Sequence, residues 1–95
     1  MIVRIASVQV VPERIDEMIS NYRKTLRPVY EQCQGLRQHY CLADRYNGHV
    51  KLVGFWDSQE ALDTANPALE SARERYWETY QETPTLEAYE VAGEI

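Results

Sequence analysis

The chain has 95 residues, enough for one domain with a single core and too few for two. Its two cysteines, Cys33 and Cys41, cannot build a disulfide framework, and no apolar run approaches the roughly 18 residues of a membrane span. Ten basic against fifteen acidic residues give a net charge of −5, which argues against a general nucleic-acid binder because such a protein needs a cationic face. We therefore expect one domain over residues 1–95, in the cytoplasm, with neither nucleic acid nor a membrane as partner.

An alternating, β-branched segment opens the chain and predicts a strand over residues 1–11. Pro12 suits a first helical turn, and apolar residues then recur at steps of three and four, which predicts a helix of about five turns. Pro28 interrupts this stripe and predicts a kink, whereas Gly35 predicts the helix end. The stripe consists of Ile15, Met18, Tyr22, Leu26, Val29 and Cys33.

Two strand-like runs, Leu36–Arg45 and His49–Trp56, meet at Asn47-Gly48, the preferred sequence of a two-residue type I′ hairpin turn. Such a turn predicts a register in which the numbers of paired residues sum to 95. One face then pairs Tyr40 with Phe55, Leu42 with Val53 and Asp44 with Lys51; the other pairs His39 with Trp56, Cys41 with Gly54 and Ala43 with Leu52. We expect the first face to pack in the core.

The second half of the chain predicts a short helical turn over residues 59–64 and then a new long helix, with Asn66 as its cap and Pro67 in its first turn. Its apolar stripe is formed by Leu69, Ala72 or Arg73, Tyr76 and Tyr80. Glutamates at a spacing of four follow another side, which is typical of a solvated face. Residues 86–95 predict a closing strand.

The order β-α-β-β-α-β predicts a ferredoxin-like α+β fold, with a four-stranded antiparallel sheet and both long helices on one of its faces. The other face then has no cover within the chain. We expect it to carry Trp56, Leu52, Val8 and Val10, too many apolar groups to be left in water. The sequence therefore predicts a homodimer whose two sheets pack face to face around a shared barrel interior.

Three segments carry a resemblance to a known family: Val10-Val11-Pro12-Glu13, Cys33-Gln34-Gly35-Leu36, and the stretch from Phe55 to Leu62. With them the chain resembles the antibiotic biosynthesis monooxygenase family of dimeric α+β barrels, from Ile2 to about Val91. The resemblance implies a cofactor-independent monooxygenase that takes a proton from a small aromatic, polyketide-like or quinol-like compound and lets the carbanion react with dioxygen. It implies no cofactor and no metal.

His39 is the candidate catalytic base, because an unperturbed histidine titrates near neutrality. We expect it to face the barrel interior, with Trp56 as a stacking wall. Arg4 either binds an anionic substrate group there or lies in water at a strand edge. The candidate substrate-binding residues are Trp56, Cys41, Gly54, Leu52, Arg4 and Tyr76.

The chain also departs from the resembled family. Many members carry a His, and the haem-degrading members a Trp, where this chain has Ala65 with Asn66 next to it. The haem-degrading members also carry an Asn near Ala6 or Ser7 and an axial His near Arg75. These departures argue against haem degradation. They leave two alternatives to the oxygenase: a non-catalytic ligand-binding or stress-response protein, in which His39 is a structural hydrogen-bonded residue, and an isomerase or cyclase using the same acid/base groups.

Overall fold

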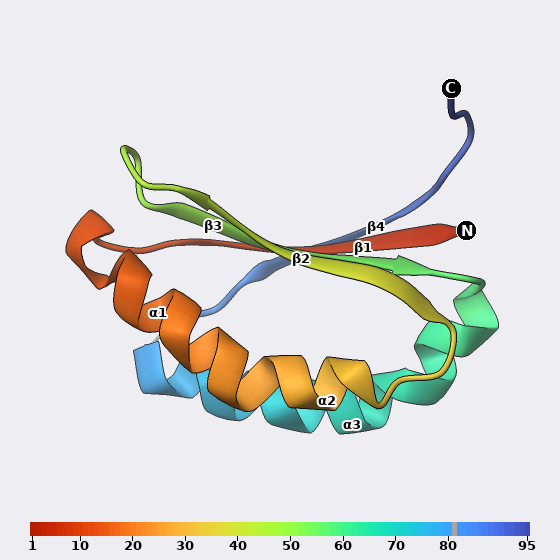
Figure 1. The fold of residues 1–95 in the computed structure, drawn as a ribbon, viewed down its shortest axis with the longest axis horizontal. Helices are drawn as coiled ribbons and strands as arrows, with labels where there is room; N and C mark the ends of the chain where they lie inside the picture. Colours follow the sequence, from red (N-terminus) through yellow and green to blue (C-terminus); the bar gives the residue numbers. More distant parts are fainter. Residues whose placement is uncertain (81) are drawn as a thin grey trace.

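The structure is a computed structural model that describes residues 1–80 and 82–95. Four strands form one antiparallel sheet in the order β2-β3-β1-β4, and the helices lie against one of its faces (Figure 1). This is the predicted ferredoxin-like α+β fold. In chain order the elements are β1 (Ile2–Gln9), η1 (Pro12–Arg14), α1 (Ile15–Asn21), η2 (Tyr22–Leu26), α2 (Arg27–Glu31), β2 (Leu36–Asp44), β3 (His49–Trp56), α3 (Gln59–Tyr80) and β4 (Thr85–Glu90).

The first helical region, residues 12–31, buries the predicted stripe from Ile15 to Leu26 and is irregular in the middle; the last two stripe residues, Val29 and Cys33, are only half-buried. The element η2 is a π-helical turn, closed by a bond from the Arg27 N–H to the Tyr22 carbonyl. It ends at Leu26, two residues before Pro28, which has no N–H to donate. The irregularity predicted at Pro28 thus takes the form of a π turn that begins six residues earlier.

The hairpin between β2 and β3 has a four-residue loop, so the predicted register is wrong by two: His39 pairs with Gly54, and Asp44 with His49. Asp44 does not pair with Lys51, because its carboxylate accepts hydrogen bonds from the loop residues Tyr46 and Asn47 instead. Because side chains alternate between the two faces of a strand, a shift of two residues changes the partners but not the set of side chains that share a face.

The loop ends at Gly48, which has a φ of +76° and lies against the end of β1. Its carbonyl accepts the N–H of Val10 over 2.8 Å. A Cβ at this position would lie 2.0 Å from the Val10 carbonyl oxygen, so the close approach and the positive φ both require glycine.

The two predicted helices of the second half are one continuous helix, α3. Pro67 lies inside it, and Asn66 is not its cap. The carbonyl that loses its partner to Pro67 belongs to Asp63, which is exposed, so water can satisfy it. The predicted apolar stripe of this helix is confirmed, because Leu69, Tyr76 and Tyr80 are buried. Of the two alternatives for its second position, Arg73 is buried and Ala72 is only half-buried.

The assignment of the two sheet faces is reversed relative to the prediction. Trp56 (1% exposed) and Leu52 (2% exposed) lie in the core beneath the helices, so Leu52 is not an interface residue of an open face. Tyr40 and Leu42 lie on the uncovered face and are each 48% exposed. The face of His39 is the covered one because its small residues leave room for long helical side chains. These small residues are Ala6 and Gly54, both of which are buried.

The last strand is shorter than predicted. β4 pairs with β1 from Thr85 to Glu90 instead of continuing to Ile95. The Val91 N–H donates to the Met1 carbonyl over 2.9 Å, which adds one hydrogen bond just beyond the last paired residues of β1 and β4.

Candidate functional site

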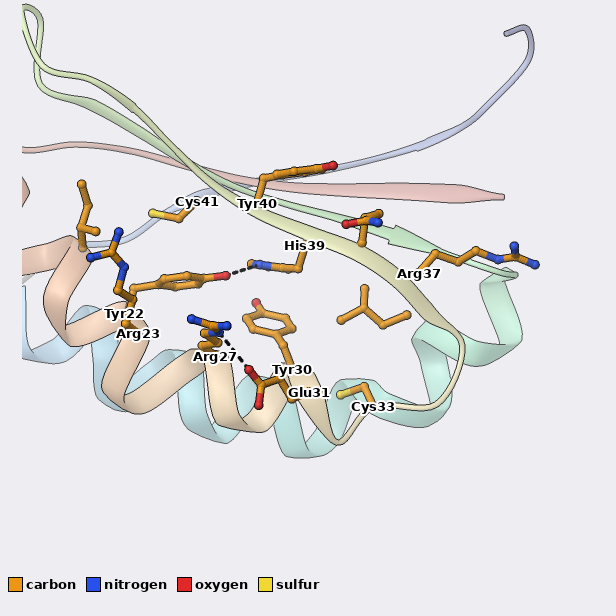
Figure 2. A pocket seen from close by; sticks show the side chains of 13 residues that line it. Tyr22, Arg23, Arg27, Tyr30, Glu31, Cys33, Arg37, His39, Tyr40 and Cys41 are labelled. Atoms are coloured by element: carbon orange, nitrogen blue, oxygen red, sulfur yellow. Dashed lines mark hydrogen bonds and ion pairs between the residues drawn. The ribbon is translucent and has the colours of Figure 1, made fainter.

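His39 is the centre of a polar cluster between β2 and the first helical region (Figure 2). The hydroxyl oxygen of Tyr22 lies 2.6 Å from its Nδ1. The ring of Tyr30 stacks on the imidazole, with the two ring centroids 3.7 Å apart. Residues eight apart lie about 80° apart around a regular α-helix. The extra residue of the π turn brings Tyr22 and Tyr30 nearer to the same side, where both reach one strand residue.

Burial lowers the pKa of His39 to about 4, with the positive charge of Arg73 as the second cause. Burial also raises the pKa of Tyr22 to about 12. At neutral pH the imidazole is therefore uncharged and the phenol keeps its proton. In the tautomer in which Tyr22 donates to Nδ1, the ring's own proton lies on Nε2.

A cleft of about 460 Å³ lies beside this cluster, between the first helical region and β2 (Figure 2). We call it the β2 cleft; it is lined by Tyr22, Tyr30, His39 and Cys41, among others, and by the charged residues Arg23, Arg27, Arg37 and Glu31. Arg27 pairs with Glu31 over 2.9 Å. Arg37 pairs with Asp57 just outside the lining. Arg23 is the one lining arginine without an ion-pair partner among the described residues, and this single positive charge suits an anionic ligand.

Two arginines meet on the other side of His39. Arg4 reaches from β1 and Arg73 from α3, and both guanidiniums donate to Oδ1 of Asn66, over 3.4 Å and 3.0 Å. Arg73 is 7% exposed. An interior cavity of about 10 Å³ adjoins them, lined by Arg4, Ala6, Tyr30, His39, Leu52, Gly54, Trp56 and Arg73.

The structure brings most of the predicted site residues together. His39, Trp56, Gly54, Leu52 and Arg4 all line the interior cavity. His39 and Trp56 are not cross-strand partners; they approach each other over Gly54. A Cβ on Gly54 would lie 3.0 Å from the Trp56 Nε1 and 3.3 Å from the His39 Cδ2.

Two predicted residues lie apart from the cavity. Cys41 lines the β2 cleft, and burial raises the pKa of its thiol. The hydroxyl of Tyr76 donates to the Met18 carbonyl over 2.7 Å, so this side chain ties α3 to α1. Tyr30, Arg73 and Asn66 belong to the site but were not among the predicted site residues. An arginine in an apolar helical stripe was the available signal for Arg73.

The pH dependence of stability tests the environment of His39. At pH 5 the unfolded chain carries a proton on this ring and the folded chain does not, so acid favours unfolding. Lowering the pH from 7 to 5 is expected to cost about 2 kcal/mol of unfolding free energy through this residue. Urea unfolding at both pH values measures it. His39→Gln should lose this part of the pH dependence, whereas His49→Gln, at an exposed hairpin position, should keep it. An unchanged dependence in His39→Gln would contradict the buried, neutral ring.

Among residues 1–80 and 82–95, no group of three or more His, Cys, Asp or Glu side chains is arranged to hold a metal ion. Within the same residues, no helix combines the length and the apolar character needed to cross a membrane.

The sheet, the helical layer on one face and the polar cluster between them define a ferredoxin-like α+β protein with an internal polar site. The sequence profile of the antibiotic biosynthesis monooxygenase family matches residues 1–75, so the chain belongs to this family. Two proteins of Mycobacterium tuberculosis, both described as uncharacterized, are 27% identical to it over 90 residues, or 95% of this chain. The chain spans about 40% of the length of these curated relatives.

Solved structures show the same fold at low sequence identity. A monooxygenase from the gene ActVA-Orf6 of Streptomyces coelicolor, in complex with nanaomycin D, is 15% identical with a TM-score of 0.83, covering 99% of this chain and 89% of its own. SnoaB, a cofactor-independent oxygenase from Streptomyces nogalater, is 15% identical with a TM-score of 0.71, covering 99% and 93%. A dimeric ferredoxin-like protein from an uncultured marine organism is 10% identical with a TM-score of 0.73, covering 99% and 95%.

Proposed function

We propose that this protein is a cofactor-independent monooxygenase that oxidises a small, electron-rich aromatic compound of the quinol or polyketide type. The observation that carries the proposal is His39, held between two tyrosines at the wall shared by the β2 cleft and the interior cavity. Family membership supports the reaction type. SnoaB, described as a cofactor-independent oxygenase, and the ActVA-Orf6 monooxygenase, bound to nanaomycin D, share the fold.

In the proposed reaction a substrate in the β2 cleft loses a proton from an activated carbon to His39. The carbanion adds dioxygen to form a peroxide anion, which takes up a proton and loses water to leave a carbonyl group. One CH2 group and one O2 thus give one C=O group and one H2O. The positive charge of Arg23 in the cleft favours the anionic form of the substrate, and the charge of Arg73 stabilises negative charge near the ring.

The low pKa of His39 favours a second candidate, a protein that binds a small aromatic ligand without converting it. A ring with a pKa of about 4 is a weak base toward a phenol or an activated CH2 group. An anion bound in the cleft would raise this pKa, as an opposite charge does. In the second candidate the ring stays neutral and only hydrogen-bonds to the ligand.

We also propose that the protein is a homodimer whose sheets pack through their uncovered faces. This face carries apolar side chains from all four strands: Val3, Ile5, Tyr40, Leu42, Phe55 and Tyr89. Tyr40 and Tyr89 are 48% and 53% exposed in the single chain, and a partner sheet would cover them. The uncultured marine organism's protein of the same fold is described as dimeric.

Oxygen uptake separates the two functional candidates. The wild type is incubated with anthrones, naphthols and hydroquinones, with oxygen consumption followed at an electrode and products by mass spectrometry. The oxygenase predicts one O2 consumed for each carbonyl formed, without added flavin or metal. Saturable binding of a panel compound, seen by tryptophan fluorescence without oxygen uptake by any of them, would contradict the oxygenase and support the ligand-binding protein.

A further inference from the structure

The interior cavity has room for one species of about the size of a water molecule. It lies between the middle of the sheet and α3, and its polar walls are mainly hydrogen-bond donors. Arg4 and Arg73 supply guanidinium N–H groups, and Trp56 supplies an indole N–H. His39 adds a further N–H when its proton lies on Nε2.

The two guanidiniums have no anionic partner among residues 1–80 and 82–95 within ion-pair distance. Both donate to one neutral acceptor, Oδ1 of Asn66, through a single N–H of each, and the Tyr30 hydroxyl is a second neutral acceptor beside Arg73. The Nε of Arg4 is fully buried and makes no hydrogen bond to a described residue. Two neighbouring positive charges and a buried donor without a protein acceptor among the described residues thus adjoin this cavity.

Such an arrangement is costly in a folded protein. Buried charges are normally paired, whereas Arg73, which is 7% exposed, and the half-buried Arg4 contact only neutral acceptors among the described residues. Burial and the charge of Arg73 both lower the pKa of Arg4, whereas Glu70 raises it less. Glu70, Glu74 and Glu78 are exposed on α3 at the cleft on the far side of the arginines. Water and salt screen them, so they do not replace a direct counter-ion.

We propose that the interior cavity binds one small inorganic anion of halide size, held by Arg4 and Arg73. A water molecule would satisfy the free N–H groups but would leave both charges unpaired. A halide accepts several N–H groups at once and neutralises one of the charges. This site does not depend on the proposed oxygenase activity, and it predicts binding in the absence of any aromatic ligand.

Bromide is the probe. Protein exchanged into sodium gluconate is titrated with sodium bromide at constant ionic strength, and its Tm is recorded. Because an anion that binds only the folded state stabilises it, a tenfold excess over Kd should raise Tm by roughly 5–10 °C, with saturation. A crystal soaked in bromide should show an anomalous peak within hydrogen-bond distance of the Arg4 Nε.

Variants locate the effect. Arg4→Gln and Arg73→Gln should abolish the bromide-dependent rise, while Arg4→Lys should keep a weaker one. In gluconate alone Arg4→Gln should be at least as stable as the wild type, because it removes one of two repelling charges. Arg75→Gln, at an exposed position of the same helix, should respond as the wild type does. No saturable rise in the wild type, or an equal rise in Arg4→Gln, would overturn the proposal.

Discussion

Replacing Tyr40 by Asp is expected to convert the protein from a dimer into a folded monomer. The side chain is 48% exposed on the uncovered sheet face and packs edge-to-face on Phe55, so the single chain tolerates a carboxylate there. Two packed sheets would bury that carboxylate in each copy without a partner, at a cost of several kcal/mol. The dimer dissociation constant should therefore rise by roughly 10²–10⁴-fold. Sedimentation velocity across a concentration series measures it.

Leu86→Asp is the matched control for this experiment. Leu86 is 51% exposed, but it lies on the helix-facing side of β4, opposite Ala6 of β1. Leu86→Asp introduces the same charge at a similarly exposed position, but on the helix-facing side and not on the proposed interface. This variant should therefore remain dimeric. Circular dichroism checks that both variants are folded. A wild type that sediments as a monomer at micromolar concentration, or equal dissociation of both variants, would contradict the proposed interface.

Much of the fold could be predicted from local patterns. The stripe from Ile15 to Leu26 is buried, because apolar residues at steps of three and four fall on one side of a helix and only a sheet is available to cover them. The order of the elements likewise left one arrangement with right-handed crossovers. These inferences depend on periodicity, which a single sequence shows directly.

The choice of sheet face could not be predicted in the same way. Both faces of the hairpin carry apolar residues, and the larger pair, Tyr40 and Phe55, favoured the wrong one. What decides the orientation is the volume of the side chains that come from the helices. Tyr22 and Tyr30 stack on His39, and Tyr30 shares the space beside Gly54; this complementarity between distant elements is not visible in a strand's own pattern.

The candidate site was predicted only in part, because some of its residues stand out in the local pattern and others are placed by contacts between distant elements. His39 and Arg4 stand out in a strand because titratable groups are uncommon at alternating apolar positions. Asn66 was misread because Asn-Pro is a typical helix start, yet here the amide turns inward to accept from Arg73. A helix cap and the hydrogen bond from Arg73 would both use the side-chain oxygen of Asn66. The sequence alone favours the cap, because its backbone partner is close in the chain.

His39→Ala is expected to lower kcat for an oxidisable phenolic substrate by roughly 10²–10⁴-fold, as loss of a general base does. Alanine also removes the partner of Tyr22 and the ring that stacks on Tyr30, so a second variant is needed. His39→Gln keeps an acceptor for Tyr22 but cannot take up a proton, and its kcat should fall as far as that of the alanine variant.

The pH profile then distinguishes a base from a structural residue. If His39 is the base, kcat/KM of the wild type should rise with pH through an inflection near the pKa of the free enzyme, about 4. Both His39 variants should lose that inflection while still binding the substrate. His49→Gln, which changes the exposed histidine at the start of β3, should keep the wild-type profile. Turnover retained in His39→Gln would mean that the ring acts by hydrogen bonding alone, because glutamine reproduces that contact and nothing else of the imidazole.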